Sequence, residues 1–170
     1  MRYNIIIENE EYRALLKELE KLEESRKYCK HGLEHLLDVA RISYIMILED
    51  GADISKDIVY AASLLHDIGR VKTYHQSGED HDRVSADIAE KILSECGYSP
   101  EEIRQICDAI LSHRCRRNTG DFIKARESGQ KLGLSEYLQI SDHISRKCFN
   151  CGSSDTCKWK EEERNTNIYI

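Results

Sequence analysis

Six histidine and aspartate side chains are spread along this sequence in an order that can build a metal site. Two of them are adjacent, His66 and Asp67, and they close an apolar run over residues 58–65. Buried ionisable groups are costly unless they are paired or bound to a metal, so packing alone does not explain the pair. The remaining candidates are His35, His81, His113 and Asp142. Imidazole with carboxylate suits Mn, Fe, Co, Ni or Zn, and the pattern therefore predicts a divalent transition-metal site.

The adjacent pair leaves open whether the site holds one ion or two. Consecutive residues of a regular helix point about 100° apart, which makes it hard for His66 and Asp67 to share one ion. A helix end relaxes this limit, and so does a pair of ions roughly 3.5–4 Å apart that Asp67 bridges. Four neutral imidazoles and two carboxylates around two divalent ions leave a charge of about +2, which favours a phosphoryl group.

Each candidate ligand also has a purely structural interpretation. Taken alone, His35 could be a core histidine, and His113 could sit at a helix end because the dipole there favours it. His81 could be an exposed residue at the start of a helix, and Asp142 a buried ion-pair partner. The joint pattern is stronger, because the candidates come from five segments that a helical bundle can bring to one pocket.

Three further histidines are weaker candidates. His31 precedes His35 by four residues and can share its helix face, so it either supports the ligands or is solvated. We expect His75, in a loop, and His143, beside Asp142, to be bystanders.

The composition bounds the class of protein. The chain has 170 residues, enough for one domain with a hydrophobic core. Its net charge of −6 argues against generic binding to nucleic acid or to an anionic membrane. No apolar run is long enough to cross a membrane and the first residues are not a secretory signal, so we expect a cytoplasmic protein.

One proline and nine glycines among 170 residues indicate an α-rich chain. We expect an all-α, single-domain bundle of about six helices over residues 1–170, with a core at about 31–146 and a cysteine-containing tail at 148–170. Apolar periodicity predicts the helices at about 9–27, 31–49, 55–67, 83–95, 99–113 and 134–146. Residues 71–82 and 114–133 are expected to be loops, and the one strand considered is Tyr3 to Ile7.

Capping residues mark several helix ends. Asn9 and Ser55 are expected N-caps, and Ser99 opens a capping box with a proline at the first helical position. Gly51 and Gly69 are expected C-caps. The first helix carries a leucine stripe, which either covers the core or, if exposed, permits a homodimer.

Three segments resemble the HD superfamily of metal-dependent phosphohydrolases. They are His35-Leu36-Leu37-Asp38-Val39-Ala40, Ala61-Ala62-Ser63-Leu64-Leu65-His66-Asp67-Ile68-Gly69-Arg70 and Leu138-Gln139-Ile140-Ser141-Asp142-His143. The resemblance implies that His35, His66, Asp67 and Asp142 are the core metal ligands of an HD-domain-like fold. His81 and His113 resemble the extra pair of two-metal members.

The resemblance implies hydrolysis of a small phosphorylated substrate such as a nucleotide. In that reaction a metal-activated hydroxide attacks phosphorus, Asp67 orients or bridges it, and Arg70 neutralises phosphate charge. Further candidates for the cationic role are Arg114, Arg116, Arg117 and Arg146. Two alternatives stay open, a di-iron oxygenase of the HD type and a non-catalytic module that senses a metal or a ligand.

The cysteines form a second pattern. An odd total of seven indicates free thiols or metal ligands instead of a disulfide framework. Cys148, Cys151 and Cys157 have a spacing typical of a zinc or Fe–S site, which needs a fourth ligand. That ligand could be Cys29, Cys107, Cys115 or a histidine, and the competing interpretation is a set of plain reduced thiols.

Overall fold

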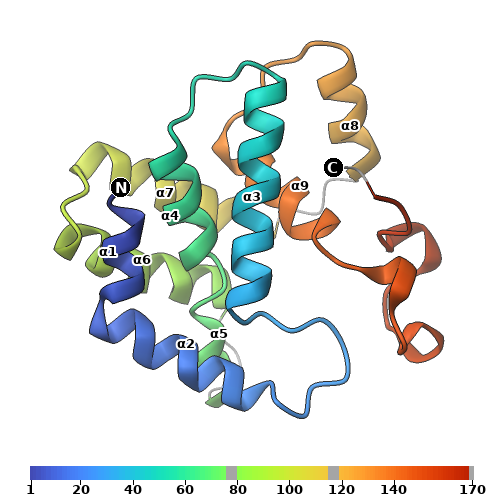
Figure 1. Cartoon of the computed structure of the whole chain (residues 1–170), viewed down its shortest axis with the longest axis horizontal. Helices are drawn as coiled ribbons and strands as arrows, with labels where there is room; N and C mark the ends of the chain where they lie inside the picture. Colours follow the sequence, from blue (N-terminus) through green and yellow to red (C-terminus); the bar gives the residue numbers. More distant parts are fainter. Residues whose placement is uncertain (76–79, 115–118, 169–170) are drawn as a thin grey trace.

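The computed structural model describes residues 1–75, 80–114 and 119–168, and this part of the chain is α-helical with short 3₁₀ turns (Figure 1). The all-α expectation is confirmed. The helices are α1 (Tyr3–Glu8), α2 (Glu10–Leu22), α3 (Leu33–Glu49), α4 (Lys56–Leu65), α5 (Arg70–His75), α6 (His81–Glu95), α7 (Pro100–Ser112), α8 (Thr119–Glu127) and α9 (Leu134–Ile144). The 3₁₀ turns are η1 (Cys148–Asn150), η2 (Ser154–Thr156) and η3 (Glu161–Glu163).

The described residues hold nine α-helices where about six were expected. Residues 3–8 form α1, not a strand, because Ile6 enters the core and Tyr3 stacks on Tyr60 of α4 with ring centroids 4.7 Å apart. Short helices α5 and α8 occupy parts of the two expected loops. Neither carries a long apolar stripe, so periodicity could not reveal them.

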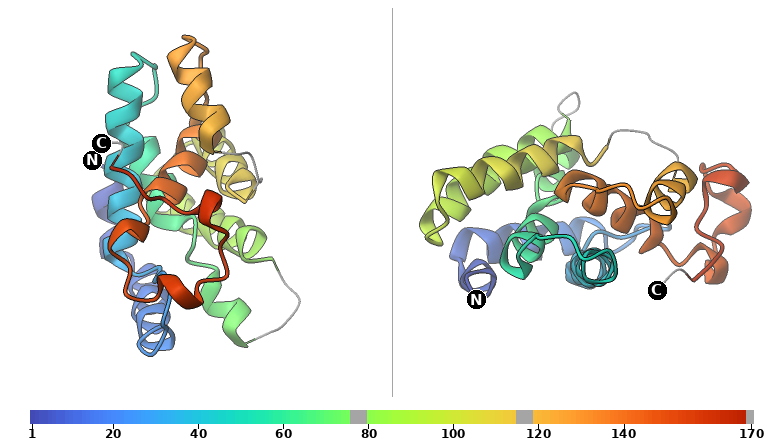
Figure 2. Two further views of the ribbon diagram at one scale, coloured as in Figure 1. Left: turned by 90° about the vertical axis from the view of Figure 1, so that its right-hand side faces the viewer. Right: turned by 90° about the horizontal axis from the view of Figure 1, so that it is seen from above.

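Helix α4 lies at the centre of the bundle, packed against α3 on one side and α7 on another. Helix α6 packs on α7, and α9 packs on both α3 and α7 (Figure 2). One hydrophobic cluster joins residues of α1 to α4 and α6 to α9. The helix that ends at residue 65 is therefore covered on every side, which is what its unbroken apolar run requires.

Most of the expected caps are present. Asn9 Oδ1 accepts from the backbone N–H of Tyr12, and Ser55 Oγ accepts from that of Ile58. Ser99 and Glu102 form the predicted capping box. Gly51 follows α3 with a φ of 61°, the left-handed conformation expected after a helix end.

The expectation for Gly69 is wrong. It is not one of the glycines with a positive φ, so it is no left-handed cap. A Cβ added there would lie 2.4 Å from the backbone nitrogen of Ser85 and 2.6 Å from the carbonyl oxygen of His81. Glycine is needed because the first turns of α6 cross the chain at this point. The Gly69 N–H also donates to Ser85 Oγ at 2.9 Å.

The leucine stripe of the first predicted helix is not an exposed surface. Leu16 and Leu19 of α2 are buried, so the stripe faces the molecule and gives no support to a homodimer. The helix also ends at Leu22, before the predicted Lys27, and the chain then runs as a loop to α3. In the described parts of the chain, no helix combines the length and the apolar character needed to cross a membrane.

Candidate metal centre

The structure brings the other five predicted ligands together around the sixth, Asp67, whose side chain is fully buried. Asp67 Oδ1 lies 3.2 Å from His81 Nε2 and 3.6 Å from His113 Nε2. Asp67 Oδ2 lies 3.5 Å from His66 Nε2 and 3.8 Å from His35 Nε2. Each oxygen of one carboxylate thus faces its own pair of imidazoles.

The ligand atoms divide into two groups, each with its atoms within 4.8 Å of one another. The first group holds His35, His66 and Asp142, with His35 Nε2 3.4 Å from Asp142 Oδ1. The second group holds Asp67, His81 and His113. Since the other oxygen of Asp67 faces the first group, this carboxylate lies between two sites that a pair of ions could occupy.

Unpaired polar atoms test whether a cation fits here. His35 Nε2, His66 Nε2 and both carboxylate oxygens of Asp67 are buried and make no hydrogen bond. Such groups in a protein interior cost free energy unless a partner is supplied. Divalent cations would give each of these four atoms a partner, so the residues present fit a metal centre.

Helix ends aim two of the imidazoles. His66 and His113 each follow the last residue of a helix, α4 and α7. There the ring Nδ1–H donates to a carbonyl of the final turn, Ser63 O at 2.7 Å for His66 and Ile110 O for His113. Carbonyls of a last turn have no partner within the helix, so the ring satisfies one of them. With Nδ1 fixed, Nε2 is the nitrogen left to face the cluster.

Other elements supply the remaining side chains. His81 is the first residue of α6, which the Gly69 crossing holds against the end of α4. His35 lies in the first turns of α3, with Nδ1 3.4 Å from Ser145 Oγ. Asp142 lies in the last turn of α9, beside Ser145. The helix-end position of His66 and Asp67 also removes the angular objection to their adjacency.

Burial and charge set the protonation of the centre. Burial lowers the pKa of His66 to about 4, which leaves this imidazole neutral and able to bind a metal. Burial alone would raise the pKa of Asp67, but the charge of Arg70, with smaller contributions from the surrounding histidines, outweighs it and holds that pKa well below its ordinary value. Asp67 is therefore an ionised carboxylate inside the protein.

The predicted arginine is close to this carboxylate. Arg70 Nε lies 2.8 Å from Asp67 Oδ1, although the angle between them does not make a hydrogen bond. Arg146 Nη2 lies 3.9 Å from Asp142 Oδ2, and its guanidinium lies over the Trp159 ring at 4.3 Å.

The other arginine candidates fare differently. Arg114 Nη1 pairs with Asp80 Oδ1 at 2.6 Å and lies 3.4 Å from Asp82 Oδ1. It is thus already engaged at the start of α6. Arg116 and Arg117 lie outside the described residues.

A carboxylate that the sequence did not single out lies next to the centre, in the wall of the neighbouring cavity. Glu23 is 1% exposed, and its Oε1 accepts from His31 Nδ1 and from Tyr74 Oη at 2.7 Å each. Burial opposes ionisation of Glu23, but the hydrogen bonds and charge of His31 and Tyr74 prevail and lower the pKa to about 2. The opposite nitrogen of His31, Nε2, lies 3.9 Å from Asp67 Oδ2.

Sequence reasoning left His31 undecided between support and solvation, and it is buried against the centre. Its spacing of four from His35 was the available signal. Glu23 had no comparable signal, because it stands in a run of acids and lysines. His75 pairs with Glu18 at 2.9 Å on the surface, and His143 Nε2 donates to Glu163 O at 2.7 Å, both away from the cluster.

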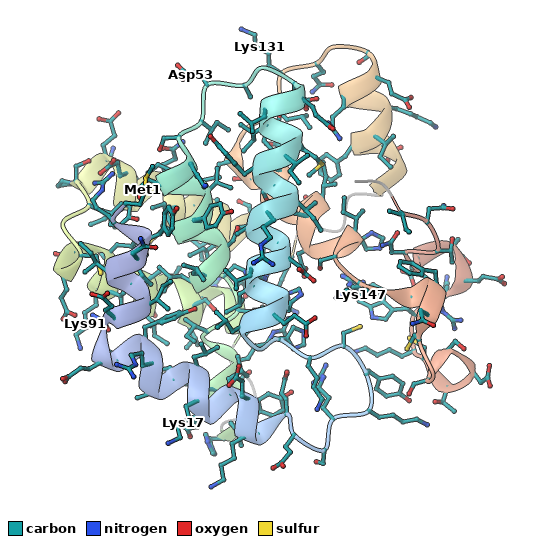
Figure 3. The ribbon with its side chains drawn as sticks, in the orientation of Figure 1. Met1, Lys17, Asp53, Lys91, Lys131 and Lys147 are labelled. Atoms are coloured by element: carbon teal, nitrogen blue, oxygen red, sulfur yellow. The ribbon has the colours of Figure 1, made fainter. Side chains whose placement is uncertain are left out.

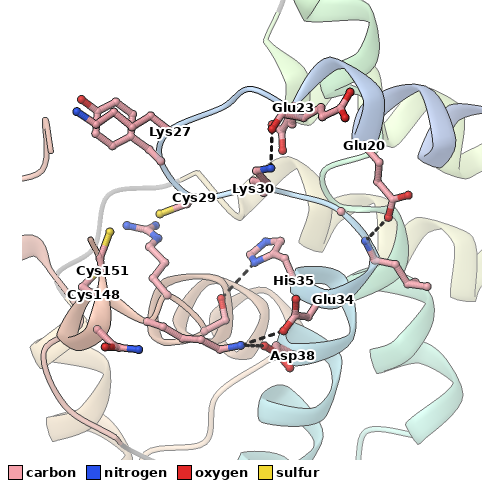
Figure 4. A pocket seen from close by; sticks show the side chains of 18 residues that line it. Glu20, Glu23, Lys27, Cys29, Lys30, Glu34, His35, Asp38, Cys148 and Cys151 are labelled. Atoms are coloured by element: carbon pink, nitrogen blue, oxygen red, sulfur yellow. Dashed lines mark hydrogen bonds and ion pairs between the residues drawn. The ribbon is translucent and has the colours of Figure 1, made fainter. Parts of the chain in front are cut away.

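A cavity of about 580 Å³ meets the cluster at His35 (Figure 4). It lies between the loop that follows α2, the start of α3 and the residues after α9. Its basic lining residues are Lys27, Lys30, Arg146 and Lys147. Figure 3 shows Lys147 between α3 and the tail, where its Nζ lies 3.3 Å from Glu34 Oε1 and 3.2 Å from Asp38 Oδ2. The volume is in the range of small-molecule sites.

Comparison with known proteins gives relatives of several kinds. An uncharacterized protein of Clostridium beijerinckii is 36% identical over 168 residues, which cover 99% of this chain and 98% of that protein. The candidate phosphohydrolase YueE of Bacillus subtilis is 30% identical, covering 72% of this chain and 81% of YueE. Ribonuclease Y of Acetivibrio thermocellus is 34% identical, but the match covers 56% of this chain and 16% of that protein. No solved structure matches the chain.

The family comparison covers the part of the chain that carries the cluster. The model of the HD domain matches residues 32–147, a range that begins three residues before His35 and ends five residues after Asp142. All six clustered side chains lie within it. The chain therefore belongs to the HD domain family.

Proposed function

We propose that this protein is a metal-dependent phosphohydrolase that acts on a small phosphorylated molecule, such as a nucleotide. The observation that carries the proposal is the buried Asp67 carboxylate, with an unpaired oxygen facing each of two ligand groups. Membership of the HD domain family and similarity to YueE, which is named a candidate phosphohydrolase, support the reaction class.

Each of the two ligand groups would hold one ion. His35, His66 and Asp142 would hold one ion together with Asp67 Oδ2, and His81, His113 and Asp67 Oδ1 would hold a second. The donor set suits Mn, Fe, Co, Ni or Zn. When bound, such ions supply an acidified water and polarise a phosphoryl oxygen.

The chain's own residues then bind and orient the substrate. Asp67, ionised and shared between the two groups, fixes where an attacking oxygen can sit. Arg70 lies beside this carboxylate, and its guanidinium would offset negative charge that develops near it, which is the task of a cation in phosphoryl transfer. Arg146 lies at the cavity wall near Asp142 and provides a guanidinium for a phosphate that enters there.

The test measures metal content and phosphate release together. The purified chain is loaded with Mn²⁺ or Co²⁺ and assayed against a panel of phosphomonoesters and nucleotides. We expect phosphate release that needs the metal and falls at least about 100-fold in Asp67→Ala, since that change removes the group common to both ligand sets. Glu18→Gln, on the exposed face of α2, is the matched control and should keep full activity.

Two outcomes would overturn the proposal. One is two irons per chain with O₂ consumption and no phosphate release, which would assign the same side chains to oxygenase chemistry. The other is a metal-loaded, folded protein that binds phosphorylated ligands but turns none over, which would make it a sensing module.

A further inference from the structure

The C-terminal tail, residues 148–168, is folded without a hydrophobic core of its own. Its three 3₁₀ turns are connected by extended segments, and Asn165 is the one residue of the tail classed as buried. Phe149 is 49% exposed and Ile168 is 78% exposed. Small folded segments that bury little apolar surface usually depend on disulfides or a bound metal.

Three cysteines sit where the turns of this tail can present them to an ion. Cys148 begins η1 and Cys151 follows it, and residues three apart in a 3₁₀ helix project from the same side. Cys157 directly follows η2. All three thiols are free and half-buried, although the tail around them is largely exposed.

The loop between α2 and α3 supplies a fourth cysteine. Tyr28 Oη donates to Thr156 O at 2.6 Å, and Ser153 Oγ donates to Lys27 O at 3.2 Å. These bonds fasten the loop to the tail at the two residues that directly precede Cys29. Figure 4 shows Cys29, Cys148 and Cys151 along one side of the cavity that meets the metal centre.

The other described thiols belong elsewhere. Cys96 is buried in the hydrophobic core. Cys107 packs against that core, and its Sγ–H donates to Ala86 O at 3.6 Å. Cys115, a candidate fourth ligand from the sequence, lies outside the described residues. Among the described cysteines, Cys29 is thus the one that can join the tail.

Basic side chains that can balance the charge of bound thiolates lie near the cysteines. Four thiolates around a divalent ion carry a net charge of about −2, which needs basic neighbours. The cavity lined by Cys29, Cys148 and Cys151 also has basic side chains in its wall, at Lys27, Lys30 and Arg146, beside several glutamates. Burial raises the pKa of Cys29, while Arg146 acts against it.

We propose that Cys29, Cys148, Cys151 and Cys157 form a tetrathiolate site for one Zn²⁺ ion, which ties the tail to the loop at the mouth of the cavity. Zinc is the ion of choice because it favours tetrahedral sulfur coordination. No three of these four sulfur atoms lie within 4.8 Å of one another in the described structure. Binding must therefore draw the loop and the tail together.

The test replaces zinc by Co²⁺ in the full, reduced chain and records the absorption spectrum. A sulfur-to-cobalt charge-transfer band in the near ultraviolet reports thiolate ligands, and the imidazoles and carboxylates of the metal centre do not produce it. We expect one such Co²⁺ per chain, displaced by one equivalent of Zn²⁺. The band should weaken strongly in Cys29→Ser and in Cys148→Ser, with helix content unchanged by circular dichroism.

Two controls separate this site from the rest of the molecule. Cys107→Ser should keep the band, and so should His66→Ala, whether or not that variant loses phosphohydrolase activity. The proposal is overturned by full intensity in Cys29→Ser, by iron with acid-labile sulfide in the purified protein, or by a Cys148–Cys151 disulfide in protein isolated under reducing conditions.

Discussion

Asp67 decides the chemistry of the centre because it is an ionised carboxylate with no hydrogen-bond donor on either oxygen. The guanidinium of Arg70 lies 2.8 Å from one of these oxygens, Oδ1, without a hydrogen bond to it. Its neighbours differ in how they are held. His66 is kept neutral by burial, whereas Asp142 raises the pKa of His35 against the effect of burial. The metal-binding imidazoles around the shared carboxylate therefore differ in their pKa values.

Residue type and spacing were enough to predict the six clustered side chains. Taken singly, His35, His81, His113 and Asp142 each had a structural interpretation, and the joint pattern with the resemblance to the HD superfamily is what singled them out. Glu23 did not stand out, because an acid within a charged run is usually solvated, and only the fold shows that it is buried. Whether His31 is buried or solvated depends on its contact with Glu23, which the sequence does not show.

The Glu23–His31 pair gives a prediction at this scale. Outer hydrogen-bond partners orient metal-binding side chains, and their loss typically costs about 10–100-fold in metal affinity. We expect Glu23→Gln and His31→Ala to weaken Mn²⁺ binding by about tenfold or more, measured by titration calorimetry. Glu18→Gln removes a similar acid–histidine pair from the exposed face of α2 and should change nothing. Unaltered Mn²⁺ affinity in both Glu23→Gln and His31→Ala would show that the pair is merely structural.

Helix ends, more than helix faces, build this site. The elements that deliver His66, His81 and His113 all begin or end at the metal centre, and α4 and α7 were predictable from their apolar periodicity and caps. Helices α5 and α8 were not predictable, because α5 has six residues and α8 little amphipathic character. The crossing of α6 over Gly69 was also hidden, since a close backbone approach leaves no mark on the sequence except the glycine.

That crossing predicts a strong effect of a single methyl group. In Gly69→Ala the new Cβ meets backbone atoms of α6, which cannot move aside as a flexible side chain could. We expect a loss of about 1–3 kcal/mol in the free energy of unfolding, measured by urea denaturation. Displacement of His81 should also lower metal binding to about one ion per chain. Gly152→Ala, which enters open space, is the control and should be neutral.

The start of α7 predicts a pH effect. Arg2 Nη2 lies 2.6 Å from Glu102 Oε1. This charged hydrogen bond, together with the one that the Ser99 N–H donates, lowers the pKa of Glu102 to about 2. A depressed carboxyl pKa adds stability above the unfolded value of about 4.5, and that stability is lost as the pH falls from there towards 2. Glu102→Gln keeps the capping box but removes the charge. It should cost about 1 kcal/mol at pH 7 and less at pH 3.

The measurement is the urea midpoint of each variant across that pH range. Glu101→Gln, one residue earlier in the same exposed turn, serves as the control and should follow the wild-type curve. An equal loss at pH 7 and pH 3 for Glu102→Gln would contradict a charge effect and assign the change to packing.

Viewed whole, the molecule is a helical bundle whose ligands come from widely separated segments. Two ligands lie within helices, His35 in α3 and Asp142 in α9, and two directly follow helices, His66 after α4 and His113 after α7. These four helices also share the hydrophobic core. The order of helices and the convergence of their polar residues could be expected from the sequence. The path of the tail could not, because its side chains bury too little apolar surface to leave a periodic pattern.

Because the ligands come from helices that share the hydrophobic core, a bound metal should stabilise the whole fold. An ion that binds only the folded chain raises the free energy of unfolding by about 2.7 kcal/mol at a free concentration of 100 times its dissociation constant. The gain should appear as a shift of the whole urea transition, because the ligands tie central helices together. Mn²⁺ is the suitable probe, since it prefers oxygen donors such as the shared carboxylate and binds soft thiolates poorly.

The matched variant is Asp67→Asn, which has nearly the same volume. It removes a charge that the fold favours, as the lowered pKa of Asp67 shows, and leaves the buried Arg70 without its partner, so its metal-free form should be less stable than the wild type. Mn²⁺ should stabilise it far less, because the shared carboxylate is gone. If the ion shifts both transitions equally, it binds elsewhere. If it shifts neither, the unpaired oxygens of Asp67 serve some purpose other than holding a metal.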